Sequence, residues 1–151
     1  MKITDGSAYL NEIRGLIIEY TNSLERDLSF QHLTEELNDL EHSYTGENGR
    51  LLAALSDEGN VVGCVALRRH TADRCEMKRL YVTAYRHLNL GRQLIEKIIK
   101  LAREDGYREM VLDTIRPLKS AIRLYEAFGF REIGAYYENP MDDVIYMGLA
   151  L

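Results

Sequence analysis

The spacing of apolar and polar residues predicts that the chain begins with helices. One segment carries apolar side chains at helical intervals with polar residues between them, at Leu10, Ile13, Leu16, Ile17 and Tyr20. A second, shorter helix is expected over residues 31–37. The segment between them, residues 27–30, is expected to form a loop that buries one aromatic residue, Phe30.

Beyond residue 50 the apolar residues come in short continuous runs, which indicates strands. The runs 51–55 and 61–67 flank the polar residues 57–60, which form a turn signal between two strands. A third strand is expected over residues 75–82. Three further strands are expected later in the chain, over residues 110–113, 130–133 and 144–149.

Two later helices alternate with these strands. The longer one is strongly amphipathic, and its apolar face consists of Leu90, Leu94, Ile95, Ile98, Ile99 and Ala102. Gly106 follows it at a position where helices commonly end. A shorter helix is expected between Pro117 and Gly129. This order of elements predicts an α/β fold of three layers, of the α+β type.

Length and cysteine usage bound the organisation of the chain. A length of 151 residues suits one domain, and two prolines without a low-complexity stretch give no sign of a linker. Cys64 and Cys75 match no zinc-ligand spacing and fall in apolar runs, so we expect reduced core residues. The four histidines share no spacing typical of a metal site or a catalytic dyad. We therefore expect a single domain over residues 1–151 that holds no metal.

Charge and hydropathy narrow the function classes further. The formal net charge is -5 and no basic stripe is present, which argues against nucleic-acid binding. No apolar run approaches the length needed to cross a bilayer, and the N-terminus lacks the apolar core of a secretory signal. These features predict a cytoplasmic protein that binds neither nucleic acid nor a membrane.

The segment with the most chemical information is 80–92, where a strand passes through a tight loop directly into the long helix. Such a junction leaves backbone N–H groups unpaired beside the positive end of the helix dipole, and this arrangement favours a phosphate or pyrophosphate. Arg86 and Arg92 would add charge-assisted contacts to such a group. The alternative is a loop that only turns the chain and leaves its arginines in solvent. The sequence of the loop alone does not distinguish a phosphate-binding loop from one that only turns the chain.

Two motifs in the correct order resemble those of the GNAT superfamily of N-acetyltransferases. The first motif spans the strand–loop–helix junction and consists of Leu80-x-Val82, Tyr85-Arg86-x-x-Asn89-x-Gly91 and the amphipathic helix. The second is the run 121–130, which reads Ala-Ile-Arg-Leu-Tyr-Glu-Ala-Phe-Gly-Phe and is similar to A-x-x-L-Y-x-x-x-G-F. The likeness extends from about residue 51 to the end of the chain. It implies a mixed central sheet flanked by helices on both faces.

One residue departs from the first motif. Asn89 occupies the place of the usual first glycine, and His87-Leu88 replaces the small residue expected after the arginine. Asn is the non-glycine residue that best tolerates a left-handed backbone, so the turn can survive. Its side chain could crowd the pyrophosphate and lower the affinity for the donor.

The resemblance implies acetyl-CoA as the acyl donor and places it along the strand and the loop. The strand that ends at Val82 would splay from the strand 110–113, and the pantetheine arm would lie in the gap. The amides of the loop would hold the pyrophosphate, and Gly91 would allow its close approach. The residues implied in binding are Leu80, Tyr81, Val82, Arg86, His87, Leu88, Asn89, Leu90, Gly91, Arg92, Leu118, Ala121 and Tyr125.

Two residues are candidates for the chemistry, which is the attack of an amine on a thioester. An alkyl ammonium with a pKa near about 10 must lose a proton before it attacks, so a general base is useful. Glu76 stands where some relatives place this base, and its apolar neighbours are expected to raise its pKa; a purely structural ion pair is the alternative. Tyr125 stands where the family places the acid that serves the thiolate, although a core aromatic would look the same.

Other polar residues carry weaker expectations. Asp113-Thr114, at the end of a strand, could orient the acceptor amine or cap the next helix. Tyr136 and Tyr137 are expected on the rim of the acceptor site, and an aromatic rim or a dimer contact is an equal alternative. The segment 144–147 could serve as a strand edge in a homodimer, and burial in the core is the alternative for the same residues.

The resemblance therefore predicts an N-acetyltransferase that moves the acetyl group of acetyl-CoA to a primary amine by direct attack in a ternary complex. A small-molecule amine is the first expectation for the acceptor, and the acidic net charge mildly favours a cationic one. Acetylation of a protein lysine or N-terminus is the alternative within the same chemistry. A non-catalytic acyl-CoA-binding module is the alternative outside it, motivated by Asn89 and Leu118, because many relatives carry Asn in place of Leu118.

Overall fold

The computed structural model describes residues 2–27, 32–83 and 89–151. The elements follow one another along the chain as β1 (Lys2–Asp5), η1 (Gly6–Tyr9), α1 (Leu10–Ser23), α2 (Leu33–Asn38), α3 (Leu40–Tyr44), η3 (Gly46–Asn48), β2 (Gly49–Leu55), β3 (Val61–Arg69), β4 (Arg74–Val82), α4 (Leu90–Glu104), β5 (Glu109–Ile115), α5 (Lys119–Ala127), β6 (Arg131–Ile133) and β7 (Val144–Ala150).

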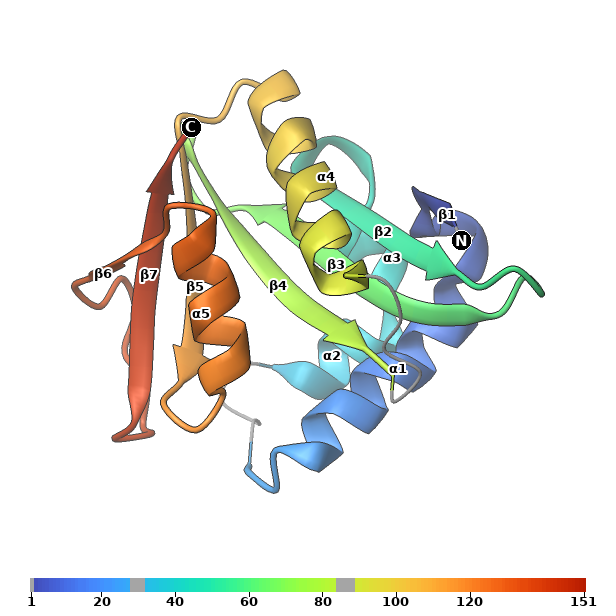
Figure 1. The fold of residues 1–151 in the computed structure, drawn as a ribbon, viewed down its shortest axis with the longest axis horizontal. Helices are drawn as coiled ribbons and strands as arrows, with labels where there is room; N and C mark the ends of the chain where they lie inside the picture. The colour runs from blue at the N-terminus through green and yellow to red at the C-terminus, as the bar shows by residue number, and fades with distance from the viewer. Residues whose placement is uncertain (1, 28–31, 84–88) are drawn as a thin grey trace.

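The strands form one seven-stranded sheet in the order β1-β2-β3-β4-β5-β7-β6. Every neighbouring pair is antiparallel except β4 and β5, which run parallel and are connected through α4. A parallel pair needs such a crossover, because a short turn cannot return the chain to the same end of the sheet. Figure 1 shows α4 and α5 on one face of the sheet and α1, α2 and α3 on the other. The expected mixed sheet between two helical layers is confirmed.

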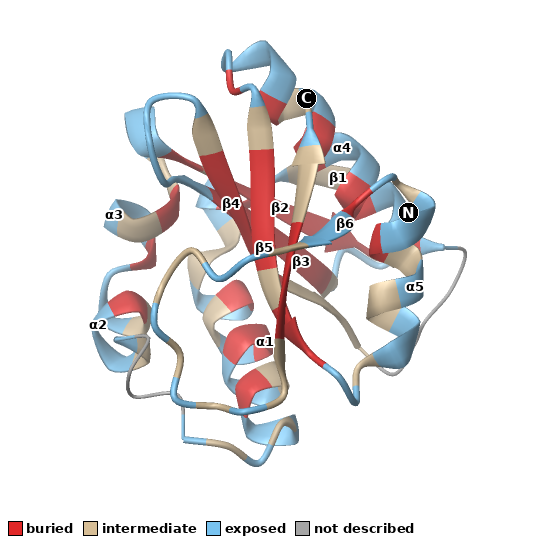
Figure 2. Cartoon of the chain, turned by 90° about the vertical axis from the view of Figure 1, so that its left-hand side faces the viewer, coloured by how far each residue is buried: buried red, intermediate tan, exposed pale blue. Residues whose placement is uncertain are grey.

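Two hydrophobic cores lie on the two faces of this sheet. Along β2, Leu52 and Ala54 point to the core beneath α4, while Leu51 and Ala53 point to the core beneath α1 and α3. The strand is covered on both faces, so its sequence is a continuous apolar run rather than an alternating one. Figure 2 shows the buried central strands between helices whose outer surfaces are exposed.

The strands β4 and β5 diverge soon after they meet. Their parallel pairing covers only three register positions, the last being Glu76 with Val111. Beyond this point the edge of β4 that faces β5 has no strand partner in the described part of the chain. The two strands therefore separate toward their carboxyl ends, as expected from the resemblance. Buried backbone N–H and C=O groups need partners, so this opening is suited to an extended ligand.

A β-bulge deforms β4 at the same level. Cys64 pairs with Tyr81 and Ala66 with Lys78, so two residues of β4 oppose one residue of β3. Within this bulge Arg79 adopts a left-handed backbone with φ 61. Its guanidinium lies beneath α2 and binds Glu36 through two hydrogen bonds of 2.8 and 3.1 Å. Both side chains are only 6% exposed, so this ion pair joins α2 to the sheet from within.

Most of the elements expected from the sequence are confirmed, including the end of α4 at Gly106, which has φ 89. Cys64 and Cys75 are buried free thiols, as expected. Strand β1 and helix α3 were not foreseen, since four and five residues leave too little periodicity to detect. The expected loop around Phe30 lies outside the described residues.

Of the two expectations for residues 144–147, a dimer edge or burial in the core, the structure supports burial in the core. Strand β7 lies inside the sheet, paired with β5 along its length and with β6 at residues 146–148. The apolar run there serves the core, and the outermost strand on this side is the short β6. Within residues 2–27, 32–83 and 89–151, no helix is long and apolar enough to cross a membrane.

The buried ion pair between Glu36 and Arg79 gives a stability prediction. Glu36→Gln leaves the Arg79 guanidinium buried without a counter-charge, so we expect the free energy of unfolding to fall by about 3–5 kcal/mol in urea denaturation. The matched control is Asp105→Asn, which breaks the more exposed pair with Arg50 and should cost about 1 kcal/mol or less. Equal losses in the two variants would contradict the structural role of the buried pair.

Candidate functional site

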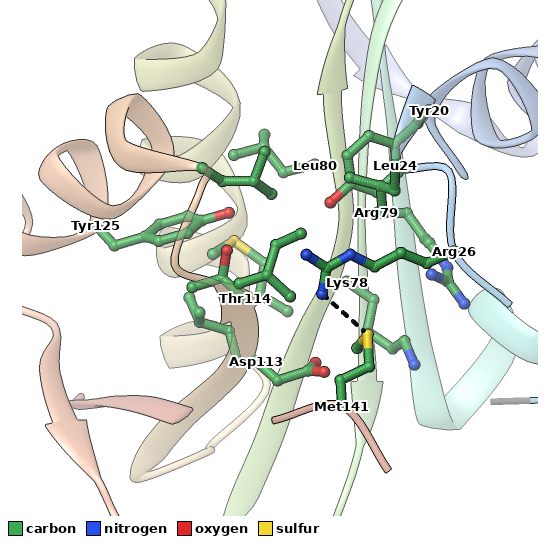
Figure 3. A pocket seen from close by; sticks show the side chains of 14 residues that line it. Tyr20, Leu24, Arg26, Lys78, Arg79, Leu80, Asp113, Thr114, Tyr125 and Met141 are labelled. Atoms are coloured by element: carbon green, nitrogen blue, oxygen red, sulfur yellow. Dashed lines mark hydrogen bonds between the residues drawn. The ribbon is translucent and has the colours of Figure 1, made fainter. Parts of the chain in front are cut away.

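The divergence of β4 and β5 opens a narrow cavity of about 60 Å³, termed here the central cavity. Its walls come from β4, β5, α1, α5 and the segment before β7 (Figure 3), with polar groups supplied by Tyr20, Arg26, Lys78, Arg79, Asp113, Thr114 and Tyr125. These residues are up to 105 positions apart in the sequence. No local motif brings them together; they meet because they all line the opening between the two strands.

Tyr125 reaches this cavity from α5, and Figure 3 shows its hydroxyl directed inward. The side chain is 8% exposed, and its ring packs edge-on against Phe130 at a centroid distance of 5.9 Å. Among the described residues, no hydrogen-bond partner of the hydroxyl is found. Burial, with smaller effects of Tyr20 and Asp113, raises the pKa of Tyr125 well above its ordinary value. The phenol is therefore protonated at physiological pH and free to donate a hydrogen bond into the cavity.

Asp113 lies opposite, on β5, with its carboxylate directed into the same cavity (Figure 3). Tyr137 donates a hydrogen bond of 2.5 Å to one carboxylate oxygen, and Asn139 donates one of 2.7 Å to the Tyr137 hydroxyl. Helix α5 has Leu118 at its N-cap and no side-chain cap, so Asp113-Thr114 does not cap it. The expectation that Asp113-Thr114 caps the next helix is therefore excluded. The other expectation, that the pair orients a substrate amine, stays a prediction.

An ion pair between distant segments lies across the central cavity. Arg26, from the segment after α1, forms hydrogen bonds of 2.5 and 2.7 Å with Asp143, which precedes β7. The same guanidinium approaches the Met141 sulfur at 3.4 Å, as drawn in Figure 3. Arg26 is thus neutralised by a partner of its own and is not an unpaired charge in the cavity. The hydrogen bonds of this pair raise the pKa of Arg26 and lower that of Asp143.

A second cavity of about 450 Å³, the α4 cavity, begins at the first turn of α4 and continues along β4. It shares Tyr20, Leu24, Leu80, Leu118 and Tyr125 with the central cavity, so the two adjoin. Nine of the residues predicted to bind the donor line it, namely Leu80, Tyr81, Val82, Asn89, Leu90, Gly91, Leu118, Ala121 and Tyr125.

The remaining predicted donor residues do not line this cavity in the described structure. Arg86, His87 and Leu88 lie outside the described residues. Arg92 is exposed and lies with its guanidinium 5.3 Å from the centre of the Phe128 ring. Asn89 has φ 59 and ψ 37, the left-handed conformation that its sequence position predicted.

Five residues of the α4 cavity were not predicted as donor contacts: Tyr20, Ser23, Leu24, Ser120 and Leu124. Tyr20 was assigned to the apolar face of its helix, where its hydroxyl gave no signal. Its ring lies 5.3 Å from that of Tyr81, so α1 forms one wall of the cavity. Leu124 lies three residues after Ala121 and four after Ser120, a helical spacing from the predicted Ala121 that could have indicated it.

Glu76 lies on the opposite side of β4, in a third cavity of about 520 Å³ beside α2 and α3, the α2 cavity. Arg68 donates a hydrogen bond of 3.0 Å to one carboxylate oxygen and Tyr136 donates one of 2.6 Å to the other. The expected rise of its pKa is wrong. Burial alone would raise the pKa of Glu76, but the Lys78 charge, the Tyr136 hydroxyl and Arg68 together lower it. The carboxylate is held in its ionised form.

Tyr136 and Tyr137 form the aromatic rim that the sequence predicted beside the site. Their ring centroids lie 5.4 Å apart, and both rings pack against Tyr146. Their hydroxyls bind Glu76 and Asp113 respectively, so the rim connects the α2 cavity to the central cavity.

The described part of the chain contains no cluster of three or more His, Cys, Asp or Glu residues that could hold a metal ion.

Comparisons with known proteins agree with this geometry. The sequence matches the acetyltransferase (GNAT) family over residues 17–130. It is 40% identical over 144 residues to an uncharacterized N-acetyltransferase of Schizosaccharomyces pombe, covering 94% of this chain and 88% of the yeast protein.

Solved structures share the fold. A GNAT-family acetyltransferase of Staphylococcus aureus is similar with a TM-score of 0.82 at 25% identity, over 99% of this chain and 98% of that one. A phosphinothricin acetyltransferase of Sinorhizobium meliloti, solved in complex with acetyl-CoA, is similar with a TM-score of 0.76 at 19% identity, over 99% of this chain and 88% of that one.

Proposed function

This chain belongs to the GNAT family of acetyl-CoA-dependent N-acetyltransferases, and on that premise we propose that it acetylates the primary amine of a small molecule by direct attack, with both substrates bound. The observation that carries this proposal is the junction of the α4 cavity with the central cavity, where Tyr125 and Asp113 face the same space. A donor entering from one side would meet an acceptor held on the other.

Acetyl-CoA is proposed to occupy the α4 cavity. Its lining is mainly apolar along β4 and α5, which suits a pantetheine arm, and its far end is the first turn of α4, where helix N–H groups favour a phosphate. A Cβ added at Gly91 would lie 3.4 Å from Leu124, and any larger side chain there would extend into space that the donor needs. A phosphinothricin acetyltransferase with the same fold was solved in complex with acetyl-CoA, which supports acetyl-CoA as the donor. When bound, the thioester supplies the activated acyl group.

Tyr125 is proposed as the acid that serves the leaving thiolate. Its hydroxyl is buried, protonated and without a partner among the described residues, and it borders both cavities. A core tyrosine would instead be expected to satisfy its hydroxyl within the protein. These properties favour the catalytic hypothesis over the purely structural one.

Asp113 is proposed to receive the acceptor amine. Its carboxylate shares the central cavity with Tyr125, and Tyr137 fixes its orientation. Glu76 remains a hypothesis as general base, but a carboxylate with a lowered pKa takes a proton less readily, and it lines the α2 cavity rather than the space before Tyr125. We therefore place the amine at Asp113 and expect Glu76 to act mainly on Tyr136 and Arg68.

Residues 1–151 are proposed to act as one N-acetyltransferase domain, supported by a single sheet that joins β1 to β7. We propose a cytoplasmic location, supported by two buried free cysteines, which are typical of a reducing compartment.

The catalytic role of Tyr125 predicts a selective loss of turnover. For Tyr125→Phe we expect kcat to fall by about 10²–10⁴-fold because the proton donor is lost. The dissociation constant for acetyl-CoA, measured by calorimetry, should stay within about threefold, since the ring remains in place. The control is Tyr107→Phe, a buried tyrosine that lines none of the three cavities. Unchanged turnover in Tyr125→Phe would favour a non-catalytic acyl-CoA-binding module.

The assignment of the amine to Asp113 predicts unequal effects of two carboxylate substitutions. Asp113→Asn should lower kcat/KM for the acceptor by about 10–100-fold, because a charge-assisted hydrogen bond to the amine is lost. Glu76→Gln should lower it by less than about 10-fold and should not move the acidic limb of the pH–rate profile. The reverse order of the two effects, with a shifted acidic limb in Glu76→Gln, would establish Glu76 as the base.

A further inference from the structure

Lys78 is a buried cation without a direct partner. It lies on β4 next to the bulge, is 9% exposed, and lines both the central cavity and the α2 cavity. Among the described residues its ammonium makes no hydrogen bond and no ion pair. Burying an ammonium without a direct partner is costly, so a structural role alone does not account for this residue.

The two buried carboxylates beside Lys78 already form hydrogen bonds to other side chains. Glu76 is bound by Arg68 and Tyr136, and Glu36 is bound by Arg79. The buried part of this cluster contains two cations, Lys78 and Arg79, and two carboxylates, while Arg68 lies exposed at its edge. Both carboxylates form direct hydrogen bonds to other side chains, and Lys78 has no direct partner among the described residues.

The other acidic residues near this cluster do not pair with the Lys78 ammonium. Glu35 and Asp39 also line the α2 cavity, but both are exposed and surrounded by solvent, and Asp39 caps α3 by accepting a hydrogen bond from His42. Water screens their charge far more than that of a buried group. Lys78 therefore has no direct counter-ion among the described acidic residues around it.

The electrostatic environment of Lys78 agrees with an unfilled anion subsite. Burial lowers the pKa of Lys78, Glu76 partly offsets this effect, and Arg79 and Arg68 add to the lowering. An anion placed against the ammonium would supply the direct partner that Lys78 lacks among the described residues. Asp113 lines the same central cavity, and its carboxylate is opposite in charge to the Lys78 ammonium.

We infer that Lys78 binds a carboxylate of the acceptor, so that the acceptor is an amino acid or a close analogue, with its amine at Asp113 and its carboxylate at Lys78. This inference rests on the proposed acetyl transfer and specifies its substrate class. It replaces the cationic acceptor suggested by the net charge of -5, because that charge describes the whole surface and not the interior of the site. A polyamine would place a second cation against the unpaired ammonium, which is unfavourable.

The experiment compares matched acceptors on matched variants. The proteinogenic L-amino acids, their carboxamides and spermidine are assayed with acetyl-CoA, since the carboxamide keeps the shape of the amino acid and removes its charge. For the best amino acid, the wild-type protein should show a kcat/KM at least about 10-fold above that of its carboxamide. In Lys78→Met this preference should vanish through a raised KM for the acid, while the rate with the carboxamide stays within about threefold. Lys97→Met, which removes an exposed lysine from α4, is the control and should keep the preference.

A second measurement needs no variant. Calorimetric titration of the wild-type protein saturated with CoA should show tighter binding of the best amino acid than of its carboxamide. Equal binding and equal rates for acid and amide, or a preference for spermidine, would overturn the inference and leave the transferase assignment intact. Absence of acetylation of any amine would instead contradict the proposed function, and absence of amino-acid binding in the same titration would overturn the inference as well.

Discussion

The separation of β4 from β5 is the constraint on which the rest of the site depends. The two strands pair over three register positions and then part, although both remain anchored elsewhere, β4 by β3 and β5 by β7. Because each strand keeps one complete neighbour, the gap costs only the hydrogen bonds between them. The gap in turn provides an open strand edge, a cavity that passes through the sheet, and access to it from both helical layers.

Charged groups lie on one side of this gap and apolar groups on the other. On the side of α4 and α5 the walls are apolar apart from hydroxyl groups such as that of Tyr125, which suits an extended ligand with few charges. On the side of α2 the bulge at Arg79 turns consecutive residues of β4 toward the same face and concentrates Lys78 and Arg79 there. The buried pair of Arg79 with Glu36 holds α2 against the sheet, and Lys78 beside it has no direct partner among the described residues. Stability and acceptor recognition are thus linked through the same short stretch of β4.

Much of this molecule could be predicted from its sequence. Continuous apolar runs marked β2, β3 and β5 because strands covered on both faces need them, and the spacing within α4 marked its apolar face. The left-handed conformation at Asn89 was predictable from residue type alone. What could not be predicted depends on distant partners. The lowered pKa of Glu76 requires Arg68, Tyr136 and Lys78 in one place, and Tyr20 becomes a cavity wall only when α1 packs beside β4. The placement of β7 inside the sheet likewise depends on its pairing with β6, a strand that was predicted but whose partner the sequence does not specify.

The most direct test of this account is a calorimetric titration of acetyl-CoA into the wild-type protein and into Gly91→Leu, with Glu96→Leu as an exposed control on the same helix. If the α4 cavity at the parting of β4 and β5 is the donor site, the wild-type protein will bind one acetyl-CoA per chain. Gly91→Leu will then weaken binding by at least about 10-fold, corresponding to about 1.4 kcal/mol, and Glu96→Leu will leave it unchanged. Binding that is unaffected by the leucine at position 91, or no binding at millimolar acetyl-CoA, would contradict the account.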